Sequence, residues 1–114
     1  MTLAKMMNTG ETTPEVDVAE TARVWEEQSA QLVDVREPRE WAEGHMPGAV
    51  HIPLGDLIRR ASELDKSRPV IAICRSGHRS LAATDALLDL GFSDVASMNG
   101  GMIAWAKAGK PIER

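Results

Sequence analysis

Apolar residues occur in short runs along this chain, and segments with a different pattern separate one run from the next. Four runs rich in Val, Ile, Leu and Ala are typical of buried strands: residues 31–35, 49–52, 69–73 and 94–98. Helical patterns occupy much of the remainder: residues 18–28, 54–64 and 79–90, a short segment opened by Pro38, and a final segment around Trp105. Strands that alternate with helices predict an α/β domain with a central, mainly parallel sheet flanked by helices.

The first residues of the chain differ from the rest. Residues 1–14 are polar, with scattered Met and Thr, and end at Pro14. We expect them to form a flexible N-terminal arm, followed by one domain over residues 15–114. A chain of 114 residues that is 43% hydrophobic and 26% charged can build one core of ordinary composition but not two.

Net charge and cysteine content narrow the classes of function. A net charge of −4 argues against nucleic acid or an acidic membrane surface as the main partner. No apolar stretch approaches the roughly 20 residues that span a bilayer, so we expect no membrane partner. Cys74 is the only cysteine, which rules out an internal disulfide. Because a reactive thiol suits a reducing compartment, we predict a cytoplasmic location.

The candidate chemistry lies in the polar loop between the run at 69–73 and the helical segment at 79–90. The loop consists of Cys74, Arg75, Ser76, Gly77, His78, Arg79 and Ser80. In a strand–loop–helix unit the loop amides and the positive helix N-terminus together form an anion cradle. Cys74 stands at the strand end, where this field and the cations of Arg75 and Arg79 should lower its thiol pKa below the usual value of about 8.5. We therefore interpret Cys74 as a thiolate nucleophile.

Asp34 and Arg36 form a second group of charged residues that could suggest catalysis. We favour a structural role near the site instead, because a loop without regular structure needs internal hydrogen-bond partners. In this interpretation Arg36 pairs with the carboxylate of Glu40 or Glu43 and pins the loop that follows it.

Metal binding is a weak interpretation of the remaining residues. Cys74 and His78 are spaced i, i+4, but one such pair falls short of the three or four ligands that zinc requires. We expect no metal and no cofactor. The other imidazole and indole side chains are expected to serve the structure: His45 and His51 in a turn and a strand, and Trp25, Trp41 and Trp105 in the core, with Trp105 also a candidate for the pocket mouth.

Three segments of the chain, taken in order, resemble the signatures of one family. They are Asp34-Val35-Arg36-Glu37 followed by residues 43–49, the loop from Cys74 to Ser80, and residues 99–102 with Trp105, Gly109 and Pro111. From Val16 to the C-terminus the chain resembles a single-domain rhodanese, a thiosulfate:cyanide-type sulfurtransferase. The resemblance implies a rhodanese-like three-layer domain, with a central mainly parallel sheet flanked by helices.

The resemblance also implies roles for the loop residues. Cys74 would be the residue that becomes a persulfide, and the backbone amides from Arg75 to Ser80 would bind the anion. Arg75 and Arg79 would attract a small sulfur donor such as thiosulfate. Since the chain has no second thiol, the sulfur acceptor must come from outside, as cyanide, a thiol or a protein.

Two other functions remain open on the same residues. Cysteine phosphatases and arsenate reductases also hold oxyanions in cysteine–arginine loops, but those on the similar fold have a loop one residue longer. The six residues from Cys74 through Arg79 favour sulfur over phosphate. A sulfur carrier without turnover of its own would need the same loop, and the sequence does not separate it from an enzyme.

Overall fold

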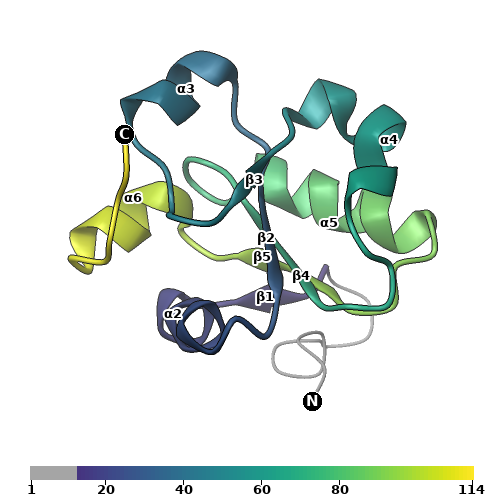
Figure 1. Ribbon diagram of the computed structural model, residues 1–114, viewed down its shortest axis with the longest axis horizontal. Coiled ribbons are helices and arrows are strands. Elements are labelled where there is room, and N and C mark those ends of the chain that lie inside the picture. Colours follow the sequence, from purple (N-terminus) through teal and green to yellow (C-terminus); the bar gives the residue numbers. More distant parts are fainter. Residues whose placement is uncertain (1–12) are drawn as a thin grey trace.

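The computed structural model describes residues 13–114, and these form one five-stranded sheet with helices on both faces (Figure 1). The strands are β1 (Glu15–Val16), β2 (Gln31–Asp34), β3 (Val50–His51), β4 (Val70–Ile73) and β5 (Val95–Met98). Their order across the sheet is β1-β5-β4-β2-β3, and each of these neighbouring pairs is parallel. The predicted α/β class with a central parallel sheet is confirmed.

The helices divide into two layers on opposite faces of the sheet. They are α2 (Val18–Glu27), α3 (Pro38–Glu43), η1 (Leu54–Asp56), α4 (Leu57–Arg60), η2 (Ala61–Glu63), α5 (Arg79–Asp89) and α6 (Gly101–Lys107). Figure 1 shows α4 and α5 over one face and α2 and α6 over the other. The three-layer arrangement expected from the resemblance is therefore present.

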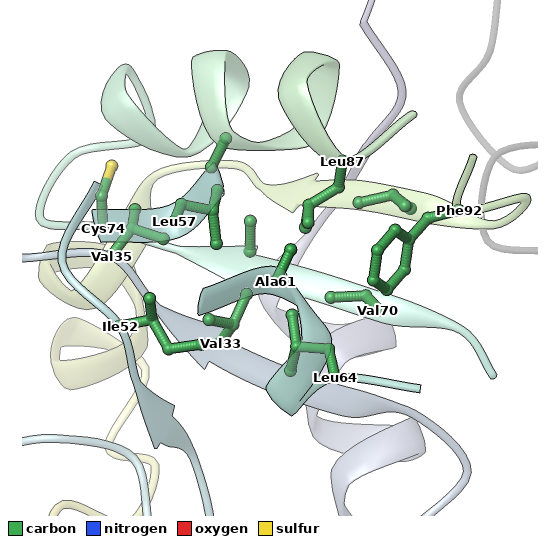
Figure 2. Packing of buried hydrophobic residues seen from close by; sticks show 13 residues of the cluster. Val33, Val35, Ile52, Leu57, Ala61, Leu64, Val70, Cys74, Leu87 and Phe92 are labelled. Atoms are coloured by element: carbon green, nitrogen blue, oxygen red, sulfur yellow. The ribbon is translucent and has the colours of Figure 1, made fainter. Parts of the chain in front are cut away.

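The side chains of the strands build a hydrophobic cluster on each face of the sheet. Successive side chains of a strand point to opposite faces, so a run that is apolar throughout can pack against two helical layers. In β4, Val70 and Ala72 join the cluster under α4 and α5, whereas Ile71 and Ile73 join the cluster under α2 and α6. Figure 2 shows the first cluster, with Cys74 at one end and Phe92 at the other. The cysteine thus follows a strand that is buried on both faces.

Two elements differ from the predicted ones. β1 was not predicted, because two residues are too short to carry a hydrophobic period. Residues 54–64 were predicted as one helix, but they form two 3-10 turns flanking a four-residue α-helix. Leu57, Ala61 and Leu64 from this segment are buried as the spacing suggested, whereas Ile58 is 69% exposed. Apolar spacing selected the buried face there but did not determine the regularity of the turns.

Residues 13 and 14, at the end of the expected arm, form hydrogen bonds with β5 and α5. The Pro14 carbonyl accepts a hydrogen bond from the Ser97 amide at 3.0 Å, and the Thr13 hydroxyl donates to the Asp85 carboxylate at 2.8 Å. The rest of the expected N-terminal arm, residues 1–12, lies outside the described residues. Among residues 13–114 no helix is both long and apolar enough to cross a bilayer.

Trp105 and Trp25 lie together on the α2 and α6 side of the sheet. Trp105 is fully buried, so it does not line the mouth of a pocket. Its indole N–H donates to the Pro111 carbonyl at 2.6 Å, and its ring packs edge-on against Trp25 with 5.9 Å between centroids. The expectation of a core aromatic is confirmed for Trp105. It is wrong for Trp41, which is half-buried outside both core clusters and stacks between His45 and His51.

The start of α6 holds the base of the cysteine loop. The Met102 amide donates to the Cys74 carbonyl at 2.8 Å, and the Ile103 amide donates to the Arg75 carbonyl at 3.1 Å. Gly101 makes this approach possible, because its φ is +58° and a Cβ there would lie 2.4 Å from the Arg75 carbonyl oxygen. A glycine at this position therefore determines how closely α6 packs on the loop.

Replacing Gly101 should damage the fold far more than replacing another glycine with positive φ. Gly101→Ala is expected to lower the free energy of unfolding by about 3 kcal/mol or more, since both strain and backbone overlap oppose the methyl group. Gly109→Ala is the matched control, with φ +72° and no atom within 4 Å of the added Cβ. It should cost only about 1 kcal/mol. Urea unfolding of both variants measures the difference, and equal losses would contradict the proposed close packing.

Candidate active site

Cys74 lies at the carboxyl end of β4, between the neighbouring strands β2 and β5. In parallel sheets ligands bind at this end of the strands. The loop then turns into α5, which begins at Arg79. The Cys74 side chain belongs to the core cluster and the residue is only 1% exposed. Its sulfur is therefore surrounded by protein, and its chemistry depends on the groups that contact it.

Backbone and hydroxyl groups surround the Cys74 sulfur. The Gly77 amide donates to Sγ at 3.1 Å, and the Ser80 hydroxyl lies 3.4 Å from Sγ. A thiolate can only accept, so the hydroxyl is the donor when the sulfur is ionised. Burial acts to raise the pKa of the Cys74 thiol, but the Ser80 hydroxyl and the amides of Ser80, Gly77 and Ser76 together lower it below its ordinary value. The local geometry favours the thiolate.

A second buried hydroxyl supports the first. Ser97 Oγ lies 2.6 Å from Ser80 Oγ, and both serines are fully buried. When Ser80 donates to the sulfur, its oxygen is free to accept the proton of Ser97. Sequence reasoning missed Ser97, which lies on β5. The available signal was a polar residue within an otherwise apolar run, because a buried hydroxyl requires a partner.

Arg79 is held by the carboxylate of Glu40, which the sequence suggested as a partner for Arg36. Its guanidinium donates to both Glu40 oxygens at 2.7 Å each. The Arg79 hydrogen bonds outweigh burial and, with the Glu37 amide, lower the pKa of Glu40 to about 2. The pKa of Arg79 is raised, chiefly by Glu40 and to a smaller extent by the nearby Cys74. Arg79 thus stands in the first turn of α5, at the end of the cysteine loop, with its charge already paired.

Asp34 and Arg36 form a buried ion pair beside the loop. The Arg36 guanidinium donates to Asp34 Oδ2 at 2.7 Å and to the Glu40 and Gly44 carbonyls at 3.2 and 2.8 Å. Its carboxylate partner is therefore Asp34, and the predicted pairing with the Glu40 or Glu43 carboxylate is wrong. Arg36 instead contacts the backbone oxygens of Glu40 and Gly44, because the end of α3 presents its carbonyls toward the buried guanidinium.

Arg75, Ser76 and His78 are exposed at the tip of the loop. Ser76 Oγ and His78 Nδ1 lie 3.2 Å apart. Arg75 forms no ion pair with the described part of the chain and borders a pocket of about 250 Å³. The pocket lies between α3, α6 and the last residues of the chain, with Glu43, Ile103 and further residues in its walls. The sequence-predicted loop residues are thus close together, but they face different surroundings.

The rings of Trp41, His45 and His51 stack near the backbone of Arg36. Trp41 stacks on His45 with 3.6 Å between ring centroids and on His51 with 4.7 Å. His51 Nε2 contacts the Arg36 carbonyl at 2.8 Å, and His45 pairs with Glu113 through two backbone hydrogen bonds. His51 occupies strand β3, as the sequence suggested, whereas His45 forms an isolated antiparallel bridge with Glu113 and does not lie in the expected turn.

The arrangement suits nucleophilic chemistry at sulfur. A thiolate held by amides and hydroxyls at the start of a helix can attack an electrophilic atom without a general base. The same donors can then stabilise a negative charge that remains on the attached atom. Such a site is chemically suited to carrying a group covalently on cysteine.

Comparison with known proteins identifies the family. The rhodanese-like domain family matches residues 4–108. A sulfurtransferase of Allochromatium vinosum is 44% identical over 81 residues, which cover 71% of this chain and 76% of that protein. A Bacillus subtilis protein provisionally named as a sulfur carrier is 39% identical over 93 residues, or 81% of this chain and 50% of that protein. The chain belongs to the rhodanese-like domain family.

Solved structures agree with this assignment. The rhodanese-like domain of an Anabaena protein has a TM-score of 0.81 and 31% identity, and the match covers 90% of this chain and 80% of that one. Of the two relatives described above, one is named a sulfurtransferase and the other is provisionally named a sulfur carrier.

Removing the hydroxyl donors should raise the pKa of Cys74. We expect Ser80→Ala to raise it more, because the thiolate loses a direct donor, and Ser97→Ala to raise it less, because Ser97 acts through Ser80. The pH dependence of Cys74 alkylation by iodoacetamide measures both. Ser76→Ala is the control, since the Ser76 hydroxyl contacts His78 rather than sulfur. An unchanged midpoint in Ser80→Ala would show that amides alone set the pKa.

Proposed function

We propose that this protein is a sulfurtransferase that transfers a sulfane sulfur through a persulfide on Cys74. The observation that carries the proposal is the buried Cys74 sulfur, with the Gly77 amide at 3.1 Å and the Ser80 hydroxyl at 3.4 Å. Family membership supports the reaction class, and the named sulfurtransferases among its relatives support turnover. The loop from Arg75 to Ser80 is the proposed anion-binding segment.

The first half-reaction charges the cysteine. The Cys74 thiolate attacks the outer sulfur of a donor such as thiosulfate, the S–S bond of the donor breaks, and its electron pair leaves with sulfite. In balanced form, Cys74–S⁻ and S–SO₃²⁻ give Cys74–S–S⁻ and SO₃²⁻. The terminal sulfur keeps a negative charge, which loop amides and the N-terminus of α5 stabilise.

The second half-reaction returns the enzyme to its starting state. An external nucleophile attacks the terminal sulfur, and the electron pair of the S–S bond returns to Cys74. With cyanide the products are Cys74–S⁻ and thiocyanate, and with a thiolate they are Cys74–S⁻ and a new persulfide. The acceptor comes from outside because Cys74 is the only cysteine. Two steps through a covalent intermediate predict ping-pong kinetics.

A sulfur carrier is the second candidate. The relative provisionally named as a carrier supports it, although this chain spans only 50% of that protein. An enzyme would turn over many times with thiosulfate and cyanide, whereas a carrier would release one sulfur to a particular protein. A cytoplasmic location remains a prediction, based on the single reactive thiol.

Intact-protein mass spectrometry before and after thiosulfate is the decisive experiment. Wild type should gain one sulfur atom and lose it on addition of cyanide, because the persulfide is the proposed intermediate. Cys74→Ser should gain none. If wild type acquires no sulfur from thiosulfate or from an organic persulfide, the sulfurtransferase proposal fails. Hydrolysis of an aryl phosphate well above the Cys74→Ser control would then favour a cysteine phosphatase.

A further inference from the structure

The charges around the mouth of the cysteine loop are largely paired. Arg36 is neutralised by Asp34 in a buried pair, and Arg79 is held by both oxygens of Glu40. Arg75 has no acidic partner within residues 13–114. As far as residues 13–114 show, only one of the two arginines in the loop is therefore free to meet an incoming anion.

The Glu40–Arg79 pair is firmly held. Its two oxygen–nitrogen distances of 2.7 Å describe a bidentate contact, the strongest geometry for arginine and a carboxylate. Glu40 is itself anchored, since it accepts the Glu37 amide at 3.0 Å in the capping box of α3. Side-chain exposure is 35% for Arg79 and 19% for Glu40, so the pair lies at the surface of the site rather than beneath it.

Sulfur donors differ in how much positive charge they need. Thiosulfate brings two negative charges toward a thiolate that already carries one. Organic persulfides and thiosulfonates bring a single negative charge at most. A cysteine loop in which one of the two arginines is already paired opposes the doubly charged donor more strongly, because repulsion from the thiolate grows with the product of the charges.

We propose that Glu40, by neutralising Arg79, selects singly charged sulfur donors over the dianion thiosulfate. This inference rests on the proposed sulfur transfer and names the donor class for it. Glu40 is a specificity-determining residue that acts through Arg79 and does not contact the reacting sulfur. The residue lies on α3, 39 positions from Arg79 in sequence.

Two donors that differ by one charge provide the test. Methanethiosulfonate has the same transferable sulfur as thiosulfate, with a methyl group in place of one anionic oxygen. Its reaction is balanced in the same way: Cys74–S⁻ and CH₃SO₂–S⁻ give Cys74–S–S⁻ and CH₃SO₂⁻. The measured quantity is kcat/KM for methanethiosulfonate divided by kcat/KM for thiosulfate, with cyanide as acceptor.

Glu40→Gln should lower this ratio by about fivefold, mainly through faster reaction with thiosulfate, because Arg79 gains an unpaired charge near the donor. The glutamine can retain the capping contact with Glu37, so α3 should persist. Combining it with Arg79→Gln removes the released charge and should abolish the gain. Increased sensitivity of the thiosulfate rate to salt should accompany Glu40→Gln alone.

Glu43→Gln is the matched control. Glu43 lies on the same helix and borders the same pocket, but it forms no ion pair with the described residues. Its substitution removes one negative charge without releasing Arg79, so the ratio should change by less than about twofold. If Glu43→Gln matches Glu40→Gln, general surface charge explains the effect and the proposal for Glu40 is overturned.

The outcomes separate this inference from the function on which it rests. Sulfur uptake from both donors by wild type, with an unchanged ratio in Glu40→Gln, would overturn only the selection by Glu40. Uptake from neither donor would overturn both. If Glu40→Gln unfolds, Glu40→Asp keeps the charge but is too short for the bidentate contact, and it should lower the ratio by a smaller factor.

Discussion

A thiolate removed from water is unstable unless hydrogen-bond donors replace its hydration, and Cys74 is only 1% exposed. This constraint explains the construction of the whole carboxyl edge of the sheet. The Gly77 amide reaches the sulfur because the loop turns directly into α5, and the Ser80 hydroxyl reaches it from the first turn of that helix. β5 supplies Ser97 behind Ser80. The Cys74 sulfur, the groups that donate to it and the serine behind them thus come from consecutive parts of one β-α-β unit.

The proposed sulfur transfer would place two different anions in turn, a thiolate and a persulfide, at this one site. A persulfide extends the thiolate by one sulfur and keeps a negative charge, so amides that stabilise the first can stabilise the second without rearrangement. This stabilisation comes from amides, so it does not require an unpaired cation beside the sulfur. Asp34 neutralises Arg36 in the interior, where an unpaired guanidinium would be costly, and Glu40 neutralises Arg79 nearer the surface. In the proposed mechanism, charge at the mouth of the site influences which donors approach, whereas amides and hydroxyls stabilise the thiolate.

α3 and α6 contribute to the site without supplying the nucleophile. α3 carries Glu40 and presents backbone oxygens to Arg36. α6 caps the carbonyls of Cys74 and Arg75, and it can approach that closely only because Gly101 has no side chain. The segments that resemble family signatures therefore meet at one place, each for a separate physical reason: an ion pair, an anion-binding loop and a close backbone contact.

The sequence alone determined the parts of this protein whose causes are local. Runs such as residues 69–73 are apolar throughout, so they specify a doubly buried strand wherever they pack. The cysteine loop is contiguous, so Cys74 could be proposed as the nucleophile from the sequence directly. β1 was too short for any pattern. Only the tertiary structure decided that Glu40 pairs with Arg79 across 39 positions and that Ser97 supports Ser80 across 17. Pairing of this kind depends on which strands become neighbours and how helices pack on them, and no local periodicity encodes that choice.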